Sequence, residues 1–137
     1  MGYWIIKTEP STYSWDTFVK DKKTFWNGVK NYQARNNLAK MKIGDLAFFY
    51  HSGDERKIVG IAKVTKEAYP DHTAKDPGWV MVDIELVKPV VRPVELGLIK
   101  ATPELQMIHL VRQGRLSVSE INEKEFKIIL QLAETKL

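Results

Sequence analysis

The sequence predicts one α+β domain in which helices surround a small, strongly curved sheet or barrel. Three observations support this fold class. The chain has 137 residues and is 44% hydrophobic, which suits a single domain over residues 1–137 with a real core. Several segments have strand-like composition and follow one another directly, as antiparallel strands do. Helical and strand-like segments do not alternate regularly, which argues against a parallel, Rossmann-like sheet.

Two elements are predicted near the N-terminus. The segment Tyr3–Glu9 is rich in aromatic and β-branched residues and is followed by a proline, as expected for a strand. Ser14 can accept a hydrogen bond from the first turn of a helix over Trp15–Lys20. We expect Trp4 and Trp15 to pack in the core, because tryptophan is usually mostly buried.

A longer helix is predicted over Asn31–Lys42. At 3.6 residues per turn, its apolar face consists of Ala34, Leu38 and Met41. The opposite face carries Tyr32, Arg35 and Asn36. Helix capping and a hydrated helix face would explain one asparagine, but they explain a cluster of amides with an arginine less well.

Three consecutive strands are predicted next. A Gly-Asp turn precedes Leu46–Ser52, and the polar turn Gly53–Arg56 joins this strand to Lys57–Tyr69 as a hairpin. The segment Trp79–Val87 alternates, so that Val80, Val82, Ile84 and Leu86 are expected on one face and Trp79, Met81, Asp83 and Glu85 on the other.

The C-terminal third is predicted to form a helix, a strand and a helix. The first helix starts at Thr102 and ends at Gly114, and Arg115–Ile121 forms the strand. The last helix has the capping box Asn122 and Glu125 and a core stripe of Phe126, Ile129, Leu130 and Ala133.

Composition narrows the possible functions. The chain has no cysteine, which excludes a disulfide scaffold, a thiolate nucleophile and a cysteine-ligated metal site. We see no signal peptide and no apolar run long enough to cross a bilayer, so we expect a cytoplasmic protein without a membrane segment. The net charge of +4 and the pI of about 9.2 favour an anionic partner such as nucleic acid, although ordinary soluble domains also reach this charge.

Motifs for catalysis or metal binding are missing. We find no dinucleotide or phosphate loop, no nucleophile elbow, no zinc-protease motif and no EF-hand. The three histidines, His51, His72 and His109, lack the spacing of metal ligands. We therefore expect no metal, no cofactor and no local catalytic constellation.

One stretch is too polar for a core and too aromatic for a loop. WNGVKNYQARN (Trp26–Asn36) combines aromatic, amide and cationic side chains ahead of the predicted helix. Nucleobases are recognised by such groups, through stacking on aromatic faces and hydrogen bonds from amides. The stretch therefore indicates either a base-sized polar pocket or a capped, hydrated helix end.

Four segments in order resemble the motifs of the EVE domain, a member of the PUA-like superfamily. They are YWIIKTEPSTYSWD, WNGVKNYQARNNLAKMKIGDLAFFYHS, IVGIAKVTKEAYPD and LVRQGRLSVSEI, so the resemblance covers residues 2–130. It implies a small bent β-barrel flanked by helices, with a ligand cleft between barrel and helices. It also implies a non-catalytic reader that holds a modified nucleobase of DNA or RNA, with modified cytosine such as 5-methylcytosine as the leading ligand. We further expect a monomer.

The resemblance also implies a set of site residues. The family's pocket motif falls on Trp26, Gly28, Asn31, Tyr32, Arg35 and Asn36, the strand motif adds Tyr50, His51 and Ser52, and other motifs add Lys7, Thr8, Arg115 and Ser117. Asn27 and Lys30 stand where the family usually has an acid and an arginine.

Roles for these residues follow from their chemistry. Trp26 would sandwich the base with Tyr32 or Tyr50, although Tyr50 fits the core equally well. Asn31 and Ser52 would contact the base edge. Phosphate or sugar would be held by Lys7, Lys30, Arg35, Arg115 and Ser117.

Two other functions use the same cleft. A nucleic-acid-processing enzyme could employ Lys7, Tyr50 and His51 as acid–base groups. A module for a small molecule or a protein partner is the third possibility.

Overall fold

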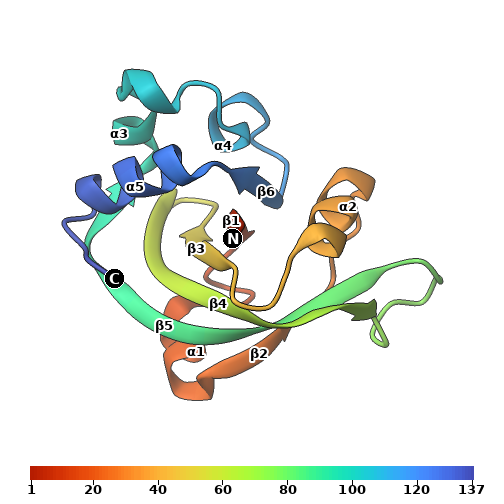
Figure 1. The fold of residues 1–137 in the computed structure, drawn as a ribbon. Coiled ribbons are helices and arrows are strands. Elements are labelled where there is room, and N and C mark those ends of the chain that lie inside the picture. The colour runs from red at the N-terminus through yellow and green to blue at the C-terminus, as the bar shows by residue number, and fades with distance from the viewer.

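Six strands form one curved sheet in the order β2-β5-β4-β3-β1-β6 in the computed structural model, which describes residues 1–137 (Figure 1). β1 and β3 are parallel and the other neighbours are antiparallel. The strands are β1 (Tyr3–Thr8), β2 (Lys23–Trp26), β3 (Leu46–His51), β4 (Lys57–Pro70), β5 (Val80–Glu95) and β6 (Val118–Ile121).

The two longest strands give the sheet its curvature. β4 and β5 pair over most of their length, and their register shifts at four places. Such irregularities bend and twist strands, and Figure 1 shows β4 and β5 sweeping together around the centre of the molecule. Beyond the other strands they continue as a hairpin that projects past α2.

The helices pack around this sheet. They are α1 (Trp15–Asp21), α2 (Tyr32–Lys40), α3 (Leu96–Lys100), the 3₁₀ turn η1 (Pro103–Leu105), α4 (His109–Arg112) and α5 (Glu123–Leu132). The predicted N-caps are confirmed, because Ser14 accepts from the amide of Thr17 at 3.1 Å and Asn122 forms the capping box with Glu125. None of these helices combines the length and the hydrophobicity that a bilayer span requires.

Four elements differ from the prediction. The short edge strand β2 and the short helix α3 were not expected. β5 runs on from Val87 to Glu95, and it can include Pro89 because β2 pairs with β5 only up to Glu85, so one edge beyond that point is free. The helix expected from Thr102 to Gly114 is broken into η1 and α4.

The broken segment has a clear physical cause. Leu105, Ile108 and Leu110 are all buried, and spacings of three and two residues do not place them on one face of a continuous helix. The Gln106 amide also donates to carbonyl groups of the preceding turns, including that of Thr102 at 2.7 Å. The segment therefore folds as short turns that each bury a side chain.

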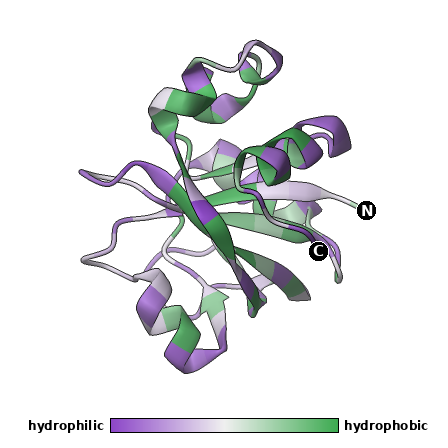
Figure 2. Ribbon diagram, turned by 90° about the vertical axis from the view of Figure 1, so that its left-hand side faces the viewer, coloured by the Kyte–Doolittle hydropathy of each residue, from purple (hydrophilic) through white to green (hydrophobic).

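Buried hydrophobic residues form two clusters, one on each face of β1 and β3. Trp4, Ile6 and Phe49 belong to the first cluster, which α1 and α2 cover. Ile5 and Phe48 belong to the second, beneath α3 and α5. Figure 2 shows the corresponding pattern, with hydrophobic colour along the strands and hydrophilic colour on the loops. The predicted burial of Trp4 and Trp15 is confirmed.

Candidate functional site

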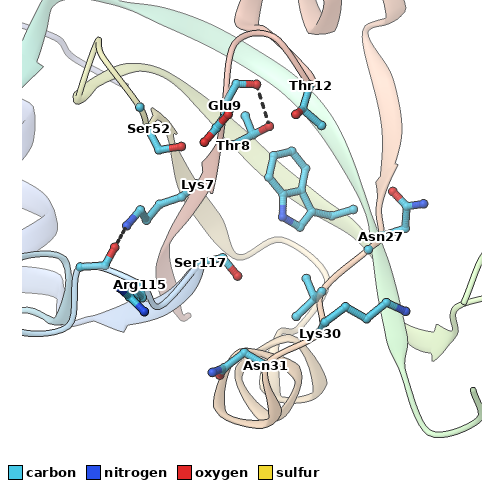
Figure 3. Close-up of a pocket in the computed structure, with 15 residues that line it drawn as sticks. Lys7, Thr8, Glu9, Thr12, Asn27, Lys30, Asn31, Ser52, Arg115 and Ser117 are labelled. Atoms are coloured by element: carbon cyan, nitrogen blue, oxygen red, sulfur yellow. Dashed lines mark hydrogen bonds between the residues drawn. The ribbon is translucent and has the colours of Figure 1, made fainter.

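A polar cavity of about 640 Å³ lies where the ends of β1 and β2 meet the loops before α2 and β6 (Figure 3). Thirteen of its fifteen lining residues are polar, charged or glycine. The lining residues are Lys7, Thr8, Glu9, Thr12, Trp26, Asn27, Gly28, Val29, Lys30, Asn31, Ser52, Gly53, Gly114, Arg115 and Ser117.

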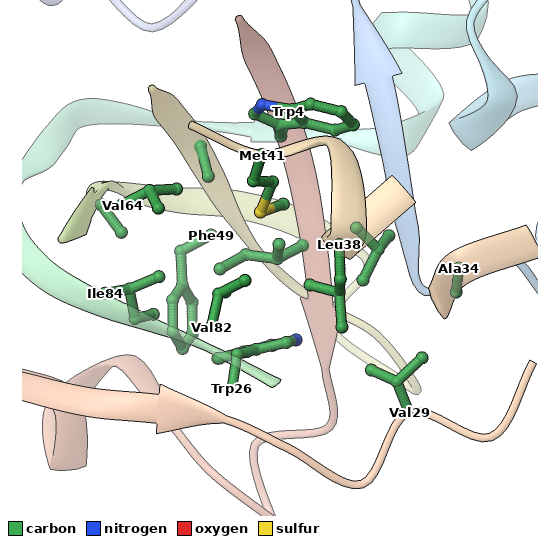
Figure 4. Packing of buried hydrophobic residues seen from close by; sticks show 14 of the residues in the cluster. Trp4, Trp26, Val29, Ala34, Leu38, Met41, Phe49, Val64, Val82 and Ile84 are labelled. Carbon is green, nitrogen blue, oxygen red and sulfur yellow. The ribbon is translucent and has the colours of Figure 1, made fainter. Parts of the chain in front are cut away.

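The chain from Trp26 to Asn31 forms one wall, and two of its side chains anchor it in the core. Trp26 is only 7% exposed and meets Phe49 edge to face, with ring centroids 5.5 Å apart. Val29 is buried as well, and Figure 4 shows both side chains in the first hydrophobic cluster. The residues between and beside these anchors stay exposed to the cavity. The stretch that looked too polar for a core is therefore fixed by the core at two points.

The same wall is tied to the β4–β5 hairpin by Asp71. Its Oδ2 accepts from the Gly28 amide at 3.0 Å, and its Oδ1 accepts from the Thr73 amide at 2.8 Å. Asn27 adds a link by donating its Nδ2 to Thr73 Oγ1 at 2.9 Å. Gly28 has φ of 74°, which favours glycine at this turn.

The surroundings of Asp71 stabilise its negative charge. Burial opposes ionisation of this carboxyl, but hydrogen bonds from Thr73 and Gly28 and the nearby Lys30 charge outweigh burial and lower its pKa. The amino-acid sequence did not point to Asp71 as part of the site. An aspartate two residues before a threonine is a common turn signal, and that signal alone does not reveal which loop the carboxylate holds.

The opposite wall carries cations. Lys7 Nζ donates to the carbonyl oxygen of Gly114, and the Lys7 amide donates to the Ser117 carbonyl at 2.9 Å. Burial lowers the pKa of Lys7. No carboxylate forms a salt bridge with Lys7 or Arg115, although Glu9 stands at the rim. The two positive charges are free to meet an anionic ligand.

A smaller aromatic cavity of about 320 Å³ adjoins the polar one. The two cavities share Thr8, Thr12, Trp26 and Asn27, and the smaller one adds the rings of Tyr13 and Phe25. Burial and a hydrogen bond to Asp21 raise the pKa of Tyr13 to about 12, so its phenol stays neutral at physiological pH. Together the cavities offer aromatic surface, hydroxyl and amide groups, and cations within one cleft.

The structure brings nine of the predicted site residues to the polar cavity. They are Lys7, Thr8, Trp26, Gly28, Lys30, Asn31, Ser52, Arg115 and Ser117. Asn31 also caps α2, because its Oδ1 accepts from the Ala34 amide at 2.9 Å. The sequence left helix capping and cavity lining as alternatives for Asn31, and in the structure this residue does both.

Two predicted residues lie elsewhere, in the core. Tyr50 is 2% exposed and belongs to the second hydrophobic cluster, because alternation along β3 turns it away from Phe49 and the cavity. His51 is buried, accepts from the Trp15 amide at Nε2 and pairs with Glu55 at Nδ1, each at about 3 Å. Neither side chain lines this cavity, and the contact of Tyr50 and His51 with a ligand stays a prediction.

Three further residues lie outside the cavity on the exposed face of α2. Tyr32 stacks on Trp79, with centroids 5.2 Å apart and planes 19° apart. The guanidinium of Arg35 lies 4.9 Å from the Tyr32 ring centroid and donates to Asn36 Oδ1. The expected sandwich of Trp26 and Tyr32 is not formed. Trp79 was not predicted as a site residue, although a lone tryptophan after a Pro-Gly turn is a usable signal.

No group of three or more histidine, cysteine, aspartate or glutamate side chains is placed to hold an ion.

Comparison with known proteins gives consistent matches along the whole chain. A family model, the EVE domain, matches residues 2–132. Thymocyte nuclear protein 1 from Gallus gallus is 38% identical over 168 residues, which cover 98% of this chain and 69% of that protein.

Solved structures agree with this match. The human THYN1 protein, in complex with DNA that contains 5-methylcytosine, has a TM-score of 0.92 at 33% identity and covers 100% of both chains. An ASCH structure from Zymomonas mobilis has a TM-score of 0.57 at 10% identity, covering 95% of this chain and 94% of that one, and shows a shared fold only. The predicted α+β, PUA-like fold is confirmed.

Proposed function

The chain belongs to the EVE domain family, and from this premise we propose that it is a reader module that binds a modified nucleobase in nucleic acid. Modified cytosine, with 5-methylcytosine first, is the leading ligand. The observation that carries the proposal is the polar cavity beside Trp26, in a chain whose human relative was solved with DNA containing 5-methylcytosine. Its volume lies in the range of about 300–1,000 Å³ that is usual for small-molecule sites.

The groups around the cavity match the parts of a nucleotide. The Trp26 indole provides an apolar wall for a planar base. Hydroxyl and amide groups such as those of Thr12 and Asn31 can donate to and accept from the base edge. Lys7 and Arg115, which lack carboxylate partners, suit the phosphate or sugar. A base would enter this cavity only after leaving its stack, so binding requires flipping or a single strand.

Binding of labelled oligonucleotides tests the proposal directly. Single strands with one 5-methylcytosine, with plain cytosine, or with modified RNA bases are titrated with the wild-type protein, and fluorescence anisotropy gives the dissociation constants. We expect the 5-methylcytosine strand to bind more tightly than its plain counterpart. If every modified strand binds only as well as its plain counterpart, the reader function is wrong.

Variants locate the binding site. Trp26→Ala should weaken binding by about 1–3 kcal/mol, and Trp26→Phe should weaken it less. Because Trp26 also packs in the core, thermal unfolding of both variants accompanies the titration. Arg115→Ala should weaken binding to modified and plain strands alike, whereas Arg112→Ala, an equal change of charge on exposed α4, should leave it unaltered.

The enzymatic alternative loses most of its proposed residues. Tyr50 and His51 are engaged in the core, which leaves Lys7 as the one acid–base candidate of that set inside the cavity. The reader is therefore the better-supported function. The proposal extends to a monomeric state and a cytoplasmic location, and a chain without cysteine suits a reducing compartment. Light scattering on the purified protein checks the monomer.

A further inference from the structure

An aromatic pair, one ring exposed and the other half-buried, lies beside the cavity but does not line it. We call Tyr32 of α2 and Trp79 of the β4–β5 hairpin the ring pair. The two rings stack at 5.2 Å although their residues are far apart in the sequence. Tyr32 is 67% exposed, so its contact with Trp79 removes little apolar surface from water. Core packing does not account for this arrangement.

Two cations accompany the ring pair. Lys30 Nζ lies 5.4 Å from the Trp79 ring centroid, and the Arg35 guanidinium lies 4.9 Å from that of Tyr32. Neither cation takes part in a salt bridge. Aromatic faces flanked by cations without carboxylate partners are the features with which proteins hold single-stranded nucleic acid.

The ring pair is continuous with the cavity through Lys30. This residue lines the cavity, and Figure 3 shows it across the opening from Lys7 and Arg115, with its ammonium extending away from the cavity. That ammonium is the one above Trp79. A strand whose base occupies the cavity would pass over this point as it leaves.

We propose that the ring pair, with Lys30 and Arg35, holds the nucleotide adjacent to the modified base in the same strand. The neighbouring base stacks on the ring pair, and the two cations contact the connecting phosphates. This inference rests on the proposed function and deepens it. The ligand is a single-stranded polynucleotide segment of at least two nucleotides, and stacking makes the second position tolerant of any base.

The experiment compares ligands that differ only beside the modified base. They are 5-methyldeoxycytidine monophosphate, a single-stranded pentanucleotide with 5-methylcytosine at its centre, and the same strand with abasic neighbours. Wild type, Tyr32→Ala and Trp79→Ala are titrated with each ligand, and Lys40→Ala on the same helix is the control. Tyr32 is mostly exposed, so its variant tests the idea even if Trp79→Ala folds poorly.

Each ring variant should bind the pentanucleotide about 5- to 150-fold more weakly than wild type does. Both should bind the mononucleotide and the abasic-flanked strand as wild type does, and Lys40→Ala should bind all ligands normally. Equal losses for all three ligands, or no loss for the pentanucleotide, would overturn the ring-pair role. A fourth strand, with plain cytosine in place of 5-methylcytosine, tests the reader function separately. If the reader function fails, this strand binds as well as the modified pentanucleotide, while the contrast between normal and abasic neighbours persists.

Discussion

The two faces of β1 and β3 lead to different surroundings, although their side chains are similarly apolar. On one face, Phe48 and Phe126 stack at 4.7 Å beneath α5, and helices close the core. On the other face, Phe49 meets Trp26 at 5.5 Å, and beyond Trp26 the core opens into the polar cavity. The closed face supplies stability alone. The open face supplies stability and, at its end, a binding wall that a buried indole holds rigidly.

This difference shows how the cleft can be stiff without being apolar. Trp26 and Val29 anchor the wall in the first cluster, and Asp71 fixes its backbone from the hairpin. The exposed groups between these anchors are therefore positioned before any ligand arrives. Binding then requires little further ordering of this wall.

Truncation of a central ring on each face should have the largest effect. Phe49→Ala and Phe48→Ala should each lower the free energy of unfolding by about 3–5 kcal/mol, because both rings are fully buried. Urea denaturation monitored by circular dichroism measures the change. If one variant unfolds at the same urea concentration as wild type, the face that it probes is not a core.

A methyl group added behind the open face should have the next largest effect. A Cβ at Gly60 would lie 2.2 Å from the Trp15 ring, so Gly60→Ala should cost about 1–3 kcal/mol of stability. Gly97 in α3 has nothing within 4 Å of such a Cβ, and Gly97→Ala should be neutral or stabilising by up to about 1 kcal/mol. The melting temperatures of the two variants should shift in opposite directions, or only that of Gly60→Ala should shift. Equal shifts would contradict the tight contact.

Substitutions at two helix caps distinguish an effect on stability from an effect on binding. Asn31 caps α2 at the cavity and Asn122 caps α5 on the closed side, each accepting from a backbone amide within 3 Å. Replacing either by alanine should cost about 1 kcal/mol of stability. Only Asn31→Ala should also weaken oligonucleotide binding in the anisotropy assay. A comparable binding defect in Asn122→Ala would show that the loss comes from stability rather than from the cavity.

The smallest effect concerns acid sensitivity. Burial opposes ionisation of Asp71 and Asp45, but hydrogen bonds outweigh it and lower both pKa values below the ordinary 3.8. Their stabilising contribution is therefore present above pH 3.8 and is lost as the pH falls through the lowered folded-state pKa. Asp71→Asn and Asp45→Asn should each flatten the fall in unfolding free energy below that pH.

Binding at neutral pH distinguishes the two carboxylates. Asp71 holds the cavity wall at Gly28, whereas Asp45 accepts from the Trp4 indole at 2.9 Å. Asp71→Asn should therefore weaken oligonucleotide binding and Asp45→Asn should not. If neither variant changes the acid limb of the stability curve, these hydrogen bonds do not favour the charged carboxylates.

Local rules predicted most elements correctly. A preceding Gly-Asp turn identified β3, alternation identified the start of β5, and side-chain caps identified the first turns of α1 and α5. β2 could not be predicted in this way, because Lys23–Trp26 has only four residues, follows a lysine-rich turn and becomes a strand only by pairing with β5. The break of the predicted helix from Thr102 to Gly114 into η1 and α4 was also not predicted, because it depends on the core surface against which these turns pack.

For the site, the sequence by itself determined the chemistry and the tertiary structure decided its arrangement. The residues already held the aromatic, amide and cationic groups of a base reader, and the order of motifs indicated the family. Only the fold placed Tyr50 and His51 in the core, joined Tyr32 to Trp79 and brought Asp71 to Gly28. The physical reason is range. Composition and periodicity act over a few residues, whereas contacts between positions more than forty residues apart depend on how strands pair and bend.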